Sequence, residues 1–95
     1  MGQTTVAEPL SELSYETREL HRAISSLIEE LEAVNLYQQR VDACKDEDLK
    51  SLLAHNRDEE KEHAAMLLEW IRRHDPTFSK ELKDWLFSEK PLGHH

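Results

Sequence analysis

Residues 49–71, LKSLLAHNRDEEKEHAAMLLEWI, decide the fold of this chain. Their apolar side chains recur every three or four positions, which is the spacing of one face of an α-helix at about 100° per residue. That face contains Leu49, Leu53, Asn56, Glu60, His63, Ala64, Leu67 and Ile71. Glu60 lies one heptad from an apolar residue on either side, and His63 lies one turn further along. The sequence therefore predicts a long helix whose buried face carries one carboxylate and one imidazole.

The flanking sequence extends this helix and adds a second one. Residues 10–75 contain neither glycine nor proline, so the whole span is expected to be helical. Its one expected interruption is Cys44-Lys45-Asp46, where the Asp46 side chain can cap a new helix. We predict a first helix over roughly Pro9–Ala43 and a second that runs to about His74. The short connection between them favours antiparallel packing.

A short third helix is expected after the second. Asp75-Pro76 combines a capping residue with proline at the first helical position, and the helix should end near Phe87. We expect residues 1–8 to form a flexible N-terminus, residues 9–90 a single helical domain, and residues 91–95 a truncated tail. Gly93-His94-His95 resembles the remnant of an expression tag, so these histidines are not candidate metal ligands.

The first helix needs a partner for its apolar stripe. The stripe consists of Leu13, Leu20, Ile24, Leu27, Leu31, Val34 and Val41. Two helices packed as a hairpin leave much of each stripe exposed, whereas two hairpins joined through these faces form a four-helix bundle. A chain of 95 residues also buries a small share of its surface when it folds alone. We predict an all-α hairpin that dimerises into a four-helix bundle.

The charge balance excludes several classes of function. With 20 Asp and Glu against 12 Lys and Arg, the net charge of −8 argues against nucleic acid or an anionic membrane surface as a partner and favours cations.

The longest apolar run, residues 64–68, is far shorter than the ~18 residues of a membrane span. The first five residues have no signal-peptide features, so an intracellular, reducing location is expected. Cys44 is the single cysteine and has no internal disulfide partner.

A second inward carboxylate is predicted on the first helix. Glu30 lies at the edge of the apolar stripe, whereas Glu29 and Glu32 point toward solvent or another subunit. A buried carboxylate without a partner is costly, so an isolated Glu60 would either take up a proton or need a cation. Each chain thus offers one Glu and one Glu-x-x-His, which is half of the ligand set of a di-iron four-helix bundle. Two copies about a two-fold axis would complete the set.

Plainer explanations exist for the same residues. Glu60 and His63 can form a protonated or salt-bridged bundle core, and Glu30 can lie on a solvated flank. Asn56 can serve only to fix the register of the helices.

A different metal site is also conceivable on the second helix. His55 and Glu59 form a His-x-x-x-Glu pattern that resembles hemerythrin ligands. Helical spacing argues against it, because both residues fall about 100° or more from Glu60 and His21 falls on the opposite flank from Glu30.

Residues 27–66, LIEELEAVNLYQQRVDACKDEDLKSLLAHNRDEEKEHAAM, resemble the encapsulated ferritins, which are short ferritin-like ferroxidases carried as cargo inside encapsulin shells. The resemblance extends weakly upstream through LHRAI (20–24). Downstream it continues through LEWIRRHDP (68–76) to WLF (85–87), so it covers nearly the whole chain. ELEAV (30–34) and AHNRDEEKEHAAM (54–66) are specific in combination.

This resemblance implies a ferritin-like fold, a ring of ten subunits built from five dimers, and a di-iron ferroxidase centre made where two subunits meet. Glu30, Glu60 and His63 would be the ligands of two irons shared by each dimer, and Tyr37 would lie close to the centre.

The resemblance also assigns outer residues and a location. Glu29 and Glu32 would be outer carboxylates that collect metal and pass it inward. Several relatives carry Trp where this chain has Leu36. Relatives also continue with a linker and a targeting peptide that docks inside the shell, whereas this chain stops after Pro91-Leu92 and the apparent tag. A cytoplasmic location inside an encapsulin nanocompartment, with the shell protein as partner, is implied by the resemblance alone.

The expected function is that of an iron(II):oxygen oxidoreductase. Two Fe(II) would bind across the dimer interface, dioxygen would oxidise them, and the Fe(III) product would leave for mineralisation elsewhere. Glu30 and Glu60 would hold the irons, with Glu60 as a bridge, and His63 would bind through one ring nitrogen. Two other hypotheses stay open: a non-catalytic dimeric assembly module, and an iron chaperone or sensor that binds Fe(II) without oxidising it.

Overall fold

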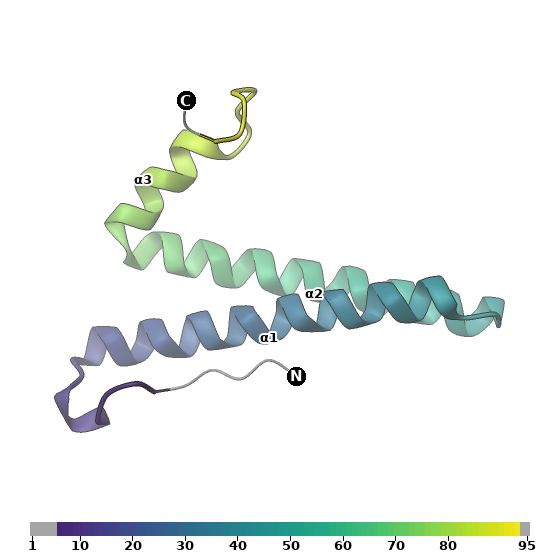
Figure 1. Ribbon diagram of the computed structural model, residues 1–95, viewed down its shortest axis with the longest axis horizontal. Coiled ribbons are helices and arrows are strands. Elements are labelled where there is room, and N and C mark those ends of the chain that lie inside the picture. Colours follow the sequence, from purple (N-terminus) through teal and green to yellow (C-terminus); the bar gives the residue numbers. More distant parts are fainter. Residues whose placement is uncertain (1–5, 94–95) are drawn as a thin grey trace.

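The chain folds as a hairpin of two long helices with a short third helix set at an angle to it (Figure 1). The computed structural model describes residues 6–93. A 3₁₀ turn, η1 (Leu10–Glu12), precedes α1 (Tyr15–Ala43), α2 (Glu47–His74) and α3 (Pro76–Trp85). Helices α1 and α2 pack side by side and antiparallel, while α3 leaves the end of α2 and points away from the hairpin. The expected all-α hairpin with a short C-terminal helix is confirmed.

Helix α1 begins later than the sequence predicted. Ser14 caps it, because its Oγ accepts a hydrogen bond from the Thr17 N–H at 3.1 Å and satisfies one of the free donors of the first turn. Upstream, the Arg18 guanidinium donates to the Leu10 carbonyl and ties η1 to α1. The prediction of a continuous helix from Pro9 is therefore wrong, whereas its end at Ala43 is confirmed.

Helices α2 and α3 begin where their capping residues led us to expect. Asp46 accepts a hydrogen bond from the Leu49 N–H at 2.9 Å, and Asp75 accepts one from the Phe78 N–H at 2.9 Å with Pro76 at the first helical position. Helix α3 ends at Trp85, shortly before the expected Phe87, whose φ of 58° lies in the left-handed region and leaves the helical path.

The core of the isolated chain is small. Among residues 6–93 the buried apolar side chains are Ala23, Val41, Ala64 and Ile71, and of these Ile71 alone is fully buried. The predicted stripe of the first helix is covered unevenly, because Ile24 is 38% and Leu31 54% exposed while Val41 is buried and the other members are half-buried. The hairpin therefore covers only part of its apolar face by itself.

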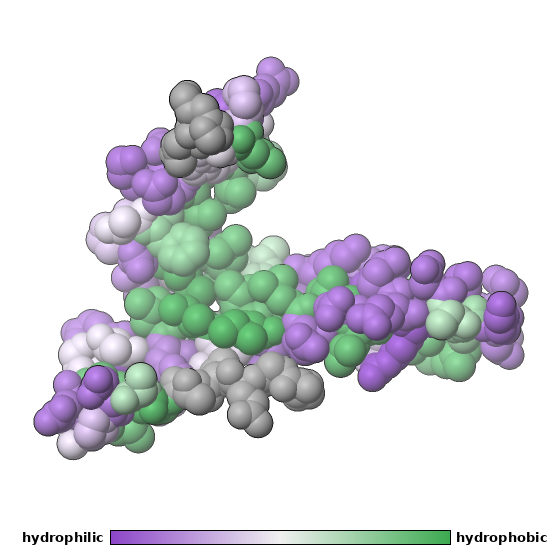
Figure 2. Space-filling view, viewed as in Figure 1, coloured by the Kyte–Doolittle hydropathy of each residue, from purple (hydrophilic) through white to green (hydrophobic). Residues whose placement is uncertain are grey.

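The exposed apolar surface is not evenly spread. Figure 2 shows it gathered on α3 and on the adjacent half of the hairpin, whereas the half that carries the α1–α2 connection is mainly hydrophilic. Large apolar side chains that are exposed in the structure include Ile24, Ile28, Met66, Phe78 and Leu86. No helix within residues 6–93 combines the length and apolar character needed to cross a membrane.

The sequence also made predictions about the chain ends. Met1 to Thr5, which belong to the expected flexible N-terminus, and His94 and His95 of the apparent tag lie outside the described residues.

Candidate metal centre

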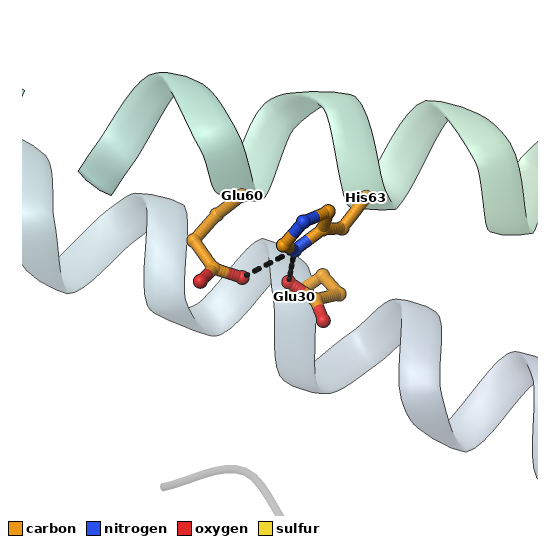
Figure 3. Close-up of side chains that lie close together, drawn as sticks. All are labelled: Glu30, Glu60 and His63. Carbon is orange, nitrogen blue, oxygen red and sulfur yellow. Dashed lines mark ion pairs between the residues drawn. The ribbon is translucent and has the colours of Figure 1, made fainter. Parts of the chain in front are cut away.

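Three side chains meet partway along the hairpin (Figure 3). Glu30 comes from α1, and Glu60 and His63 come from α2. His63 Nδ1 lies 3.5 Å from Glu30 Oε2 and 3.5 Å from Glu60 Oε2. One potential ligand atom from each residue lies within 4.8 Å of the other two. The structure thus brings together the three residues that the sequence placed on inward stripes, and their role as metal ligands stays a prediction.

The helical geometry explains this meeting. Glu60 and His63 are three residues apart, so they project from the same side of α2. The antiparallel packing of α1 then sets Glu30 opposite them. The Glu30 and Glu60 side chains are each 25% exposed and that of His63 is 42% exposed, so the three groups line a partly shielded surface rather than a sealed core.

The geometry of these residues fits a metal ion. Glu30 Oε2 is shielded from solvent and accepts no hydrogen bond. Its 3.5 Å separation from His63 Nδ1 is longer than the 2.7–3.2 Å of an ordinary N–H···O hydrogen bond. Two atoms that bind one ion at about 2.1 Å lie about 3–3.5 Å apart. Two carboxylates and an imidazole are a donor set suited to divalent iron, manganese or zinc.

The other residues assigned by the resemblance lie around this group on α1. Tyr37 is half-buried about two turns beyond Glu30, and the Arg40 guanidinium carbon lies 5.5 Å from its ring centroid. Glu29 is exposed and Glu32 is half-buried. Within residues 6–93, neither of these two belongs to a group of side chains close enough to share an ion. Their proposed role in collecting metal therefore depends on how further chains are arranged.

Leu36, at the position where several relatives carry Trp, is half-buried on α1.

The hemerythrin-like pattern does not assemble into one site. His55 Nε2 and Glu59 Oε1 pair at 3.2 Å on the exposed side of α2, and His21 belongs to no metal-binding group within the described part of the chain. A second group consists of Glu59, Glu62 and His63. Glu62 is not among the predicted site residues, although its three-residue spacing from Glu59 places the two on one side of the helix.

An arginine links the two helices near the centre. Arg57 Nη1 donates to Gln38 Oε1 at 3.0 Å across the hairpin, and Arg57 Nε donates to Asp58 Oδ1 at 3.0 Å. The Arg57 guanidinium lowers the pKa of Asp58 below its usual value, with further help from Lys61. These contacts join α2 to α1 one turn before Glu60 and help to fix how the helices face each other.

A helical hairpin with Glu on one helix and Glu-x-x-His on the other is half of the bundle that defines the ferritin-like carboxylate proteins. One family of this class is described as EncFtn-like, and its sequence-family model matches residues 5–89 of the chain. The chain belongs to the EncFtn-like family.

Individual relatives agree with this assignment. The chain is 59% identical over 85 residues to the encapsulated ferritin-like protein of Rhodospirillum rubrum, covering 90% of this chain and 61% of that protein. It is 42% identical over 85 residues to the encapsulin nanocompartment cargo protein EncC of Myxococcus xanthus, covering 88% of this chain and 65% of EncC. The chain thus spans less than two thirds of the length of either relative. The crystal structure of protein ne0167 from Nitrosomonas europaea superposes with a TM-score of 0.89 at 73% identity, covering 94% of this chain and 98% of that one.

Proposed function

We propose that this protein is a ferroxidase, which oxidises Fe(II) to Fe(III) with dioxygen at a di-iron centre shared between two copies of the chain. The observation that carries the proposal is the convergence of Glu30, Glu60 and His63 around a shielded carboxylate oxygen that accepts no hydrogen bond. Membership of the EncFtn-like family and the ferritin-like names of the relatives support it.

A second copy would complete the site. One chain supplies two carboxylates and one imidazole, which leaves coordination positions open on any bound iron. Two copies about a two-fold axis supply four carboxylates and two imidazoles, and the four negative charges balance two Fe(II) ions. The large uncovered surface of the hairpin supports such an association. The annular decamer implied by the family is proposed on the same basis.

The chain's own groups would set the binding and the charge at the centre. Glu30 and Glu60 would hold the substrate Fe(II) ions, Glu60 as a bridge, and His63 would bind through one ring nitrogen. Each Fe(II) would give up one electron, and dioxygen would take up the two electrons of a pair together with two protons from water, which gives hydrogen peroxide. The carboxylates attract Fe(III) more strongly than Fe(II), so they favour the oxidised state of the product.

The residues around the centre would control the supply of Fe(II). Glu29 and Glu32 lie on α1 beside Glu30, and we propose that they collect Fe(II) on its way to the centre. Tyr37 would lie close to the bound iron.

The name of one relative suggests a compartment in which the Fe(III) product is stored. The Myxococcus xanthus relative is named as cargo of an encapsulin nanocompartment. We therefore propose the encapsulin shell protein as a partner and a cytoplasmic encapsulin compartment as the place where the Fe(III) product is mineralised.

An anaerobic Fe(II) titration followed by native mass spectrometry tests the centre directly, and admission of air then tests the chemistry. We expect saturation at two irons per dimer and repeated oxidation of added Fe(II), recorded by the absorbance of the ferric product. Binding without turnover would replace the ferroxidase with an iron chaperone or sensor, and no binding would leave a helical assembly module.

A further inference from the structure

Arg57 makes a side-chain hydrogen bond that crosses the hairpin, because its Nη1 donates to Gln38 Oε1 on α1 at 3.0 Å. Within residues 6–93, the remaining side-chain hydrogen bonds of α1 and α2 stay inside one helix and its caps or lead to a segment that adjoins the helix in the chain. The other polar contact between the two helices in this range is the pair of Glu30 Oε2 and His63 Nδ1. Arg57 and Gln38 thus form a polar link between the helices outside the metal-binding group.

The two contacts restrain the helices at two levels of the hairpin. Gln38 lies eight residues from Glu30 on α1, and Arg57 lies six residues from His63 on α2, so the levels are about 9–12 Å apart along the helices. Contacts at two separate levels oppose both sliding of the helices and rotation about their axes. At 3.5 Å the contact of Glu30 with His63 is too long for an ordinary hydrogen bond, so the bond from Arg57 is the firmer of the two polar restraints.

Asp58 holds the Arg57 guanidinium in the orientation that reaches Gln38. Arg57 Nε donates to Asp58 Oδ1 at 3.0 Å and Nη2 donates to Oδ2 at 3.4 Å, and this pair of bonds fixes the plane of the group. The remaining nitrogen, Nη1, is the one that meets Gln38. The Arg57 side chain is 19% exposed, so packing also restricts it. A lysine has a single side-chain nitrogen and lacks this planar fork.

We propose that Arg57 is a positioning residue of the metal centre, which acts through Gln38 to keep Glu30 facing Glu60 and His63 before an ion binds. The inference rests on the metal-binding role proposed above for these three residues. Arg57 itself has no acceptor atom and carries a positive charge, so it is not a ligand. Ligands that are already in place lose less freedom on binding, so removal of the link should lower the affinity for the ion.

The first test observes the placement of Glu30 in the full chain without metal. In the presence of EDTA, nuclear Overhauser contacts between the His63 ring protons and the Glu30 side chain should be present in wild type and weakened in Gln38→Leu, which removes the acceptor oxygen. Gln39→Leu is the matched control, because Gln39 donates to Asn35 within α1 at 3.3 Å. Contacts that are absent from wild type, or equal in wild type and Gln38→Leu, would overturn the proposal whether or not the protein oxidises iron.

The second test measures the Kd of Zn(II) by competition with a chromophoric chelator. Gln38→Leu and Arg57→Met should each weaken binding about fivefold, as expected for one hydrogen bond, and Arg57→Lys should not restore it. The double variant of Arg57→Met and Gln38→Leu should be no weaker than Arg57→Met alone, because both changes remove the same bond. Gln38→Glu keeps an acceptor oxygen and should bind Zn(II) as tightly as Gln39→Glu, which adds the same charge.

The outcomes separate positioning from general support of the fold. Urea denaturation of the metal-free variants gives their stability, and a purely structural role would lower it while leaving the Kd of Zn(II) unchanged. That result would reject the positioning role. Zn(II) binding that is lost in Glu30→Gln but unaffected in Gln38→Leu would also reject it and would leave the metal centre in place. A wild-type protein that binds no Zn(II) would remove both the metal centre and the positioning role.

Discussion

Nδ1 of His63 on α2 lies 3.5 Å from Oε2 of Glu30 on α1, so a single imidazole nitrogen faces carboxylates from both helices of the hairpin. This relationship depends on the register of the two helices. A slip of one turn, about 5.4 Å, would separate Glu30 from the Glu60–His63 pair. The metal-binding group is thus a product of helix packing, and any ion bound there would hold α1 and α2 in this register.

Replacing Glu60 with Ala should abolish catalytic oxidation of Fe(II) while the hairpin still folds. Glu60 is a proposed ligand, so the rate should fall by more than the ~10–100-fold typical of changing a group that only supports a ligand. Oxygen consumption with excess Fe(II) measures the rate, and circular dichroism measures the helicity. Glu47→Ala, an exposed glutamate at the start of the same helix, is the control and should keep full activity. Activity retained in Glu60→Ala would contradict the assignment.

Metal binding should stabilise the protein by mass action. At a free metal concentration of 100 times Kd, the free energy of unfolding should rise by about 2.7 kcal/mol per site. Zn(II), which is redox-inert, allows the measurement by urea denaturation in air. Glu30→Gln should remove this gain and change the stability of the metal-free protein little, because Glu30 Oε2 accepts no hydrogen bond and its ion pair with His63 Nδ1 is long, at 3.5 Å. An equal gain from Zn(II) in both proteins would place the metal elsewhere.

The sequence predicts those parts of the fold that are set by local chemistry. Asp46 and Asp75 cap α2 and α3 as expected, since a cap depends only on a side chain and the next three residues. The start of α1 differs from the prediction because Ser14 lies in a span free of glycine and proline. The prediction followed that absence of helix breakers, whereas the helix begins at the capping hydroxyl of Ser14.

The candidate site was only partly predictable for a related reason. Helical spacing placed Glu60 and His63 on one face, but whether Glu30 faces them or solvent is decided by the register of α1 on α2, which spacing does not contain. Leu31 belongs to the predicted stripe and is exposed, because the other helices of the described chain do not cover it. Periodicity identifies an apolar face, and it does not say which element covers that face.

Ile71 should be the most sensitive core position. It is the fully buried side chain of the hairpin, so Ile71→Ala should lower the free energy of unfolding by about 2–5 kcal/mol, as is typical of large-to-small changes in a core. Leu52→Ala, at a position 55% exposed on the same helix, should cost less than about 1 kcal/mol. Urea denaturation of the metal-free protein at fixed concentration measures both. A similar loss in the two variants would mean that the packing around Ile71 does not dominate the stability.

The contribution of Glu69 to the stability of the folded chain should be lost in acid. The Arg72 and Arg73 side chains donate hydrogen bonds to its carboxylate and lower its pKa from 4.5 to about 2. Because the unfolded chain takes up this proton more readily than the folded one, the contribution of Glu69 to stability is present above pH 4.5 and is lost as the pH falls through about 2. Glu69→Gln should therefore be less stable than wild type at neutral pH, and the difference should shrink over that acid range.

Thermal unfolding of the two proteins between pH 7 and pH 2 measures this difference, which should also decrease at high salt because Glu69 is partly exposed and its charges are screened. Glu89→Gln, beyond the end of α3, changes the net charge by the same amount and is the matched control. Arg72 also donates to Ser79 on α3, so loss of the Glu69 carboxylate should loosen the angle between α2 and α3 as well. A Glu69→Gln protein whose stability follows that of wild type at every pH would show that these ion pairs contribute nothing to the fold.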